Sequence, residues 1–173
     1  MKNILVVVDM QKDFVDGALG TKEAQKIVAG VAERINGFFG DIIVTYDTHA
    51  DNYMQTSEGK NLPVPHCIKG TDGWALDSRV QAAVDKKKVT VFEKPTFGSV
   101  ALAEYVKEKY GDGVSIELIG LCTDICVVSN ALLLKATLPE AEISVDSSLC
   151  AGVTPESHSA ALTTMKMCQI NVK

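Results

Sequence analysis

The sequence predicts an α/β fold of three layers, a doubly wound domain in which helices cover both faces of a mostly parallel central sheet. Short apolar runs rich in β-branched residues recur along the chain, and helical patterns lie between them. All but the last run are apolar almost throughout, which is typical of strands buried on both sides in a parallel sheet. Alternation of strands and helices indicates a doubly wound domain.

The strands expected from these runs are residues 4–8, 42–46, 89–92, 114–119 and 143–145. After the second strand comes a long segment, residues 48–74, with two prolines, three glycines and no apolar periodicity. A loop of that length inside a small domain usually carries function. We therefore expect one domain over residues 1–173, with a functional loop at about residues 48–74.

The helices expected between and after the strands follow from apolar spacing and end signals. A stripe at i, i+3 and i+4 predicts a helix after the first strand that stops near Gly37, and the stripe recurs over residues 101–106. Residues 124–137 are apolar nearly all round, which predicts a buried helix or one at a subunit interface. A last helix begins after Thr154, the expected cap, with Pro155 at its first position.

The composition narrows the class of protein. The chain has 17 basic and 22 acidic residues, a net charge of −5, which argues against a nucleic-acid or anionic-membrane surface. Its first apolar run is shorter than the ~7 residues of a signal-peptide core, and no run approaches the ~18 residues of a membrane span. The 5 cysteines are an odd and scattered set, a poor disulfide framework. We expect a cytoplasmic protein with reduced thiols.

Rare polar residues stand where the expected strands end, and ligands of open α/β sheets bind at that edge. Cys126 falls in the first turn of a helix if Thr123 or Asp124 is the cap, and a thiol there is expected to have a lowered pKa. The alternative is that Cys126 is only a small residue of the apolar core. A nucleophilic thiolate also needs a proton acceptor and an oxyanion site. Asp9 could accept the proton, Lys94 could hold the charges, and first-turn amides could bind the oxyanion.

A second group of residues suits a metal ion. Asp47 and His49 are two residues apart and point to the same side of a strand end, while His66 comes from the far end of the long loop with Glu58 between. Two imidazoles with one or two carboxylates suit zinc, manganese or iron rather than calcium or magnesium. The alternative is that the histidines only form hydrogen bonds in a polar loop. The third histidine, His158, is expected at the surface.

These residues lie in motifs that run almost from end to end of the chain. The motifs are Val8-Asp9-Met10-Gln11-Lys12-Asp13-Phe14, Asp47-Thr48-His49, Pro65-His66-Cys67-Ile68-Lys69-Gly70-Thr71, Lys94-Pro95 and Gly120-Leu121-Cys122-Thr123-Asp124-Ile125-Cys126-Val127. In this order they resemble the isochorismatase-like cysteine hydrolases, and among these the nicotinamidases. The resemblance implies that family's α/β fold and hydrolysis of a small carboxamide, with nicotinamide, and hence a role in NAD salvage, as the first expectation.

The resemblance also implies roles for individual residues. Asp9, Lys94 and Cys126 would form the catalytic triad, in which the cysteine attacks the amide carbonyl, a thioester forms and the aspartate passes a proton to the leaving ammonia. The backbone amides of Cys122 and Cys126 would form the oxyanion hole, with a cis peptide between Leu121 and Cys122.

The implied metal site comprises Asp47, His49 and His66, with Glu58 as the extra carboxylate of one nicotinamidase subgroup. One divalent transition metal would orient the ring nitrogen of the substrate, zinc first, with manganese or iron as alternatives.

The chain departs from the nicotinamidases around the substrate. A ring-stacking tryptophan is absent before the Pro-x-His-Cys segment, and the family's second histidine after Asp-x-His is missing, with Tyr53 near that place. Ring stacking would then fall to Phe14, Tyr53 or Phe97. The substrate stays open between nicotinamide and another amide or carbamoyl compound.

Other functions fit the residues less well. A haloacid dehalogenase-type phosphatase needs an aspartate where Gln11 stands, and no G-x-G-x-x-G loop is present. If the reaction were hydrolysis of a vinyl ether without a metal, Asp47, His49 and His66 would have no purpose. A non-catalytic thiol sensor could use Cys122 and Cys126 as a redox pair, but would not need Asp9 or Lys94. The apolar stretch 132–134 suits either a homo-oligomer contact or packing on the sheet.

Overall fold

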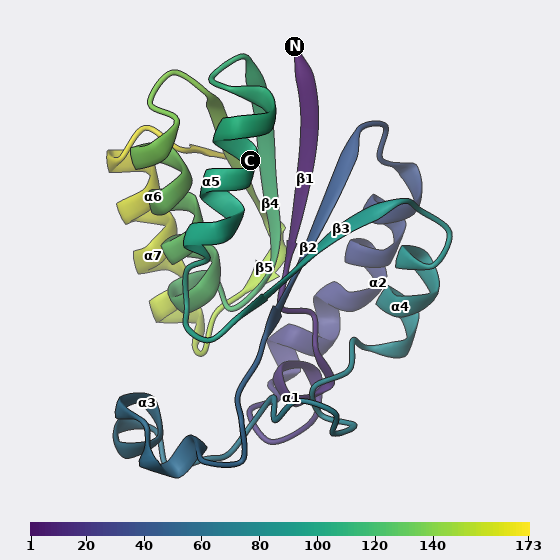
Figure 1. Ribbon diagram of the computed structural model, residues 1–173, viewed down its shortest axis with the longest axis vertical. Coiled ribbons are helices and arrows are strands. Elements are labelled where there is room, and N and C mark those ends of the chain that lie inside the picture. Colours follow the sequence, from purple (N-terminus) through teal and green to yellow (C-terminus); the bar gives the residue numbers. More distant parts are fainter.

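In the computed structural model, which describes residues 1–173, six parallel strands form one sheet in the order β3-β2-β1-β4-β5-β6 (Figure 1). The predicted mostly parallel sheet is confirmed. The strands are β1 (Lys2–Val8), β2 (Asp41–Asp47), β3 (Val89–Lys94), β4 (Val114–Leu121), β5 (Glu142–Ala151) and β6 (Asn171–Val172).

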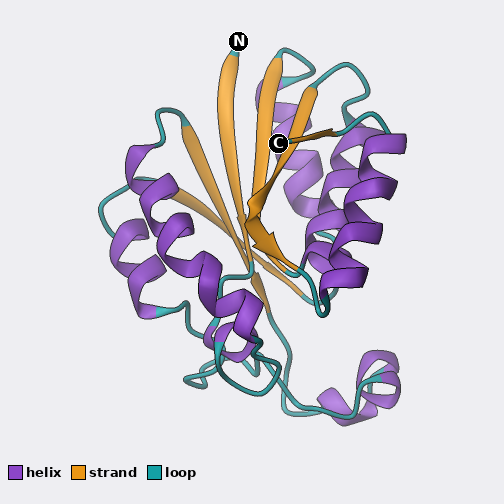
Figure 2. Cartoon of the chain, turned by 180° about the vertical axis from the view of Figure 1, so that it is seen from behind, coloured by secondary structure: helices purple, strands orange, loops and turns teal.

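Helices cover both faces of this sheet, as the sequence predicts (Figures 1 and 2). The α-helices are α1 (Lys12–Val15), α2 (Lys22–Gly37), α3 (Ser57–Asn61), α4 (Ser78–Val84), α5 (Val100–Tyr110), α6 (Val128–Thr137) and α7 (Pro155–Met167). Helices α2 and α4 lie on one face and α5, α6 and α7 on the other, with α1 and α3 beyond the edge where the strands end.

The strand β1 shows why the sheet sits at the centre. Its residues from Ile4 to Val8 are completely buried. Successive side chains point to opposite faces, so Ile4 and Val6 pack into the core beneath α5–α7, while Leu5 and Val7 pack into the core beneath α2 and α4. A continuous apolar run is thus what a strand with helices on both sides requires.

Several local features differ from the predictions. The helices α1, α3 and α4 and the short strand β6 were not predicted, because each is too short to show a clear apolar period. The helix expected from residue 124 begins with a π-helical turn, η2 (Thr123–Val127), whose cap residue is Cys122. The prediction for α7 is confirmed: the Thr154 side chain accepts a hydrogen bond from the backbone of Ser157, and Pro155 is the first helical residue.

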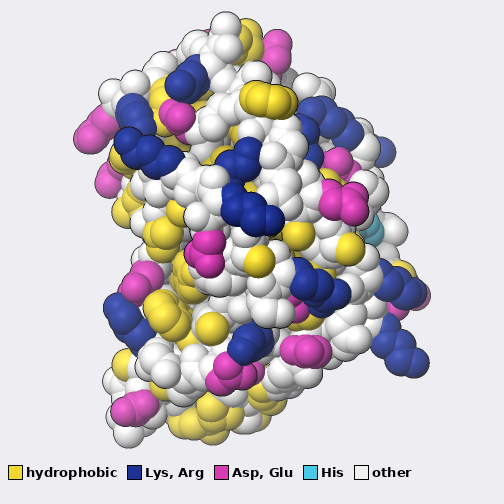
Figure 3. Space-filling model, turned by 90° about the vertical axis from the view of Figure 1, so that its right-hand side faces the viewer, with side chains coloured by type: hydrophobic (Ala, Val, Ile, Leu, Met, Phe, Trp, Pro, Cys, Tyr) yellow, Lys and Arg dark blue, Asp and Glu magenta, His cyan; other side chains and the backbone are white.

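The surface carries mixed charge. Basic and acidic side chains are interspersed on the face in Figure 3, which shows no broad patch of one sign. None of the helices has the length and apolar character needed to cross a bilayer.

Candidate active site

The parallel sheet brings the polar strand ends together, as the sequence predicts. Strands β3, β2, β1 and β4 are adjacent, with Val8 paired to Thr45 on one side and to Gly120 on the other. Asp47 pairs with Lys94 at the ends of β2 and β3. The motifs therefore meet at the carboxyl edge, at the bottom of Figure 1, where α1 and α3 also lie.

The three residues expected to be catalytic are in contact. Lys94 Nζ lies 2.6 Å from Asp9 Oδ2 and 3.3 Å from Cys126 Sγ. Thr45 Oγ1 donates a hydrogen bond of 2.6 Å to Asp9 Oδ1, so both carboxylate oxygens have a neighbour. All of these side chains are buried. Asp9 has a φ of +45°, a strained conformation for a residue with a side chain and one that clusters at functional sites.

Burial disfavours the charged forms of the side chains in this group. Burial raises the pKa of Asp9 above its usual value, although Lys94 acts in the other direction. Burial disfavours the ammonium of Lys94, but nearby negative charge, first that of Asp9 and also that of Asp47, outweighs it and raises the pKa of Lys94. The amine is therefore a permanent positive charge between its neighbours.

The expected lowering of the Cys126 pKa is wrong for this structure. Burial, followed by the charge of Asp9, raises the pKa of the thiol well above its usual value, and Lys94 only partly offsets this. Cys126 does lie in the first helical turn, but a buried site next to a carboxylate outweighs the effect of the helix end. The direction of this shift favours the protonated thiol over the thiolate.

The four candidate metal ligands also converge. One atom of each lies within 4.8 Å of the others, and the group includes Glu58, which α3 contributes. Asp47 Oδ2 is 3.0 Å from His49 Nε2 and 3.4 Å from His66 Nε2, while Glu58 Oε1 is 3.6 Å and 3.5 Å from the same nitrogens. Ligands bonded to one tetrahedral zinc ion at about 2.1 Å would be about 3.4 Å apart. The spacing and the donor atoms both fit a divalent transition metal.

Surrounding contacts orient these ligands. His66 Nδ1 donates to the carbonyl of Val64 at 2.8 Å, which leaves Nε2 facing the other ligands. The side chain of Gln11 bonds both the backbone N–H and the carbonyl of Asp47. Asp13 accepts from the backbone N–H of Cys67, the residue after His66. The motif at residues 8–14 thus supports the ligands as well as supplying Asp9.

A mostly apolar pocket opens beside both groups. Its lining includes Phe14 and Phe97, as expected, and also Leu19, Leu62 and Ile125, which the sequence analysis did not assign. Cys122, Cys126, Asp47, Glu58 and His66 complete the lining.

Tyr53 does not line this pocket. It is buried behind the metal-type residues, with its ring 4.8 Å from that of His49 and 5.0 Å from that of His66. Its hydroxyl donates to the carbonyl of Leu62. Tyr53 therefore packs the loop instead of facing a substrate.

The turn that carries Cys126 begins directly after a cis peptide bond. The peptide between Leu121 and Cys122 is cis, as the resemblance implied. None of the backbone hydrogen bonds outside helices and strands uses the N–H of Cys122. Asn130, buried in α6, donates to the carbonyl of Cys126 at 2.8 Å and to that of Phe97 at 3.1 Å. Nothing in the local sequence predicted that Asn130 would join the carbonyls of Cys126 and Phe97, because these two carbonyls come together only in the fold.

The remaining rare residues lie elsewhere. The five cysteines are all free. His158 is half-buried, not fully at the surface as expected, and its Nδ1 is 2.8 Å from Thr123 Oγ1.

Comparison with known proteins identifies relatives along the whole chain. A curated isochorismatase family protein, PncA of Bacillus subtilis, is 28% identical over 174 residues, which covers 94% of this chain and 93% of that protein. The zinc complex of the Pyrococcus horikoshii pyrazinamidase has a TM-score of 0.80 at 26% identity and covers 100% of this chain and 99% of that one. The pyrazinamidase/nicotinamidase of Streptococcus mutans has a TM-score of 0.84 at 28% identity, with 99% and 100% covered. The family model of the isochorismatase domain matches residues 3–172, and the chain belongs to this family.

Proposed function

We propose that this chain is a cysteine-dependent amidohydrolase that converts a small carboxamide to its acid and ammonia, with nicotinamide as the first candidate substrate. The observation that carries the proposal is the position of Lys94, whose ammonium contacts both Asp9 and Cys126 beside a pocket. Membership of the isochorismatase family and the similarity to pyrazinamidase and nicotinamidase structures support hydrolysis of an amide bond.

The proposed reaction follows from the contacts. Asp9 takes the thiol proton as Cys126 Sγ bonds to the carbonyl carbon, and the carbonyl electron pair moves to oxygen, where the N–H groups of Cys122 and Cys126 stabilise it. When the C–N bond breaks, Asp9 returns the proton to the leaving nitrogen, and ammonia departs from a thioester. Water then attacks the thioester, Asp9 accepts its proton, and the acid leaves as the thiol re-forms.

Lys94 would assist this proton transfer through its positive charge. Its charge favours the carboxylate form of Asp9, which burial opposes. It also stabilises the thiolate as that charge develops. Since Lys94 is buried and its pKa is raised, it would hold its own proton throughout.

The proposed cofactor is one divalent transition metal held by Asp47, His49, Glu58 and His66, with zinc first and manganese or iron as alternatives. When bound, such a metal supplies a Lewis acid for a ring nitrogen of the substrate. The zinc complex of the P. horikoshii relative supports this choice. The four side chains then fix the substrate's orientation relative to Cys126.

The proposed substrate is a flat aromatic carboxamide. Phe14 and Phe97 offer apolar surface for a ring, and Leu19, Leu62 and Ile125 enclose it. Nicotinamide matches the activity named for the S. mutans relative. Because the ring-stacking tryptophan is absent, another amide or a carbamoyl compound is the second candidate.

An ammonia-release assay over four compounds tests this function. Nicotinamide and pyrazinamide carry a ring nitrogen, benzamide has the same shape without one, and an N-carbamoyl amino acid represents the second candidate. We expect turnover of the first two, at least tenfold slower turnover of benzamide, and none after Cys126→Ala. Ammonia release that survives Cys126→Ala would contradict the nucleophile. Faster turnover of the carbamoyl compound would reassign the substrate but leave the chemistry in place.

A further inference from the structure

The turn that carries the nucleophile begins with a buried hydroxyl. Thr123 follows Cys122 directly, is completely buried and lies within η2. A buried hydroxyl needs a hydrogen-bond partner, and Thr123 Oγ1 finds it in Nδ1 of His158 at 2.8 Å. The two residues are 35 positions apart in the chain, so this bond ties the turn to α7.

The start of α7 is packed closely enough to make this contact. A side chain at Gly152 would place its Cβ 2.9 Å from the Cβ and backbone N of His158, so the approach depends on a glycine. The next residue, Val153, donates its backbone N–H to the carboxylate of Asp124 at 3.1–3.2 Å. Two successive residues of the turn are therefore anchored to the same short segment.

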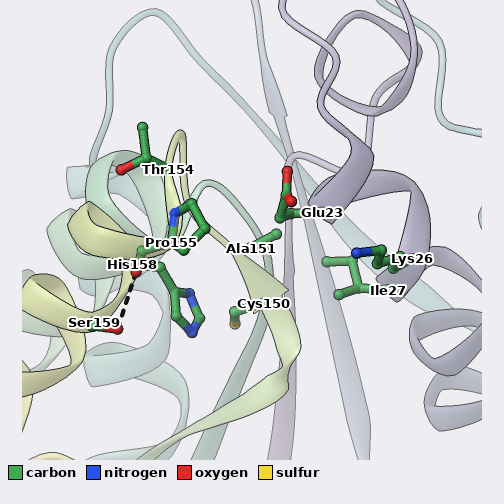
Figure 4. Close-up of a pocket in the computed structure, with 10 residues that line it drawn as sticks. Glu23, Lys26, Ile27, Cys150, Ala151, Thr154, Pro155, His158 and Ser159 are labelled. Carbon is green, nitrogen blue, oxygen red and sulfur yellow. Dashed lines mark hydrogen bonds between the residues drawn. The ribbon is translucent and has the colours of Figure 1, made fainter.

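His158 does not line the substrate pocket. It lines a separate cavity with Glu23 and Lys26 of α2 and Cys150 of β5, and Figure 4 shows its ring pointing from α7 toward Cys150. No residue of this cavity lines the pocket beside Cys126. The contact with Thr123 is thus the route by which His158 would affect the reaction.

The turn is also held from its other end. Asn130 of α6 donates to the carbonyl of Cys126, and His158 of α7 contacts Thr123. Hydrogen bonds from both helices therefore fix η2. Oxyanion donors stabilise developing charge only when they are fixed in place before the reaction. A displacement of about 1 Å in such a group can cost about 100-fold in rate.

We propose that His158 is a positioning residue of the hydrolase, which holds Thr123 and thereby the amides of Cys122 and Cys126 in register with the substrate carbonyl. This inference rests on the proposed function. His158 takes no proton and touches no substrate.

Steady-state kinetics of four variants test this role: His158→Ala, His158→Asn, Thr123→Val and the double variant His158→Ala/Thr123→Val. We expect His158→Ala to lower kcat about tenfold with KM within threefold, because oxyanion donors act on the charge of the transition state more than on the bound substrate. His158→Asn restores most of the loss, since an amide places a polar atom near the Nδ1 position. The double variant is no slower than Thr123→Val alone, because residues that act through one contact are not additive.

A matched control is Ser159→Ala, a neighbour on α7 that lines the same cavity and whose side chain bonds only to the carbonyl of Pro155. We expect wild-type kinetics. The inference is overturned if His158→Ala keeps its kcat, if asparagine restores nothing, or if the two losses add in full.

A second measurement separates this inference from the proposed function. The rate at which iodoacetamide alkylates Cys126, followed by mass spectrometry, needs no substrate. We expect a changed rate in His158→Ala and a restored one in His158→Asn. If the wild type releases ammonia from no carboxamide while these rates differ, the function fails and the positioning contact stands. Equal rates in all three proteins, together with an unchanged kcat, would overturn the contact.

Discussion

Lys94 is the side chain on which the candidate site depends most, because it contacts Asp9, Cys126 and Asp47 at once. Its contacts range from 2.6 to 3.5 Å, and it is almost completely buried. A buried ammonium in that position is tolerated only because negative groups surround it. Its removal would leave the carboxylates of Asp9 and Asp47 without the cation that both contact.

Lys94→Met is expected to remove this charge while keeping a side chain of similar length. The pKa of Asp9, already raised by burial, would rise further without its cation, which favours the protonated acid and weakens Asp9 as an acceptor of the thiol proton. We expect kcat to fall by about 10²–10⁴, the usual contribution of acid–base catalysis, measured by ammonia release. The control is Lys69→Met, an exposed ion pair with Glu93, which should behave as wild type. A kcat within threefold of wild type in Lys94→Met would contradict this role.

At the scale of residues, the sequence predicted those that belong to motifs and missed those whose role arises from folding. Asp9, Lys94 and Cys126 were chosen because they end strands, and parallel strands bring such ends together. Thr45 and Asn130 carry no such mark. The partner of Thr45 lies 36 positions away, and Asn130 joins Cys126, one helical turn back, to Phe97, which lies 33 positions away. The pKa of Cys126 was also beyond reach, because burial is a property of the packed structure.

The segment between β2 and α4 supplies most of the candidate metal ligands. It contributes His49, Glu58 and His66, and the carboxylate of Glu58 lies within 4.8 Å of that of Asp47, the last residue of β2. A bound cation would offset their repulsion and stabilise the segment. Its function was predicted from its length, but the turn η1 (Tyr53–Gln55) and helix α3 were not, because such short elements depend on tertiary contacts.

Metal analysis of the purified protein should find about one transition-metal ion per chain, and His49→Ala should lose it. A ligand present at 100 times its dissociation constant stabilises a protein by about 2.7 kcal/mol. A chelator should therefore lower the Tm of the wild type by several degrees and leave His49→Ala unchanged. The exposed neighbour Asp51→Asn should match the wild type in both measurements. Metal-free protein with full activity would argue against the site.

Strand β4 approaches β1 at a position that only glycine allows. Gly120 has a φ of +117°, and a Cβ there would lie 2.2 Å from the carbonyl oxygen of Val8. Since Val8 precedes Asp9 and Gly120 precedes the turn of Cys126, this contact sets the spacing of the site.

Gly120→Ala is expected to force these two strands apart. The free energy of unfolding should fall by more than about 3 kcal/mol, because both the φ angle and the overlap with backbone are unfavourable. Urea denaturation measures the change. Gly113→Ala, where a Cβ meets nothing within 4 Å, is the matched control and should cost less than about 1 kcal/mol. Equal stability of the two variants would contradict the argument.

At the scale of the whole molecule, Glu117 joins parts that are far apart in the chain. It is a buried carboxylate in β4 that accepts from Arg34 of α2 at 2.7 and 3.1 Å and contacts Lys173 at 3.0 Å. Burial opposes its charge, but the hydrogen bonds from Arg34 and Lys173 prevail and lower its pKa.

A lowered pKa in the folded state makes the Glu117 contribution depend on pH in a known direction. The stabilisation is fully present above the ordinary pKa of about 4.5 and disappears as pH falls through the lower, folded value. Glu117→Gln should cost about 2 kcal/mol at pH 7, as for a hydrogen bond to a charged group, and clearly less near pH 3. Urea denaturation at both pH values tests this, with exposed Glu104→Gln as the control. A loss that is the same at both pH values would contradict the electrostatic origin.

The shared carboxylate of Asp47 has a consequence for how the protein would respond to different ions. One oxygen faces the two histidines, and the other lies 3.5 Å from the ammonium of Lys94. An ion that withdraws more electron density from Asp47 leaves less for Lys94, which then interacts more strongly with Asp9. Exchange among zinc, manganese and iron should accordingly change the turnover number and not only the substrate affinity. The identity of the bound ion would then influence the charges around the nucleophile.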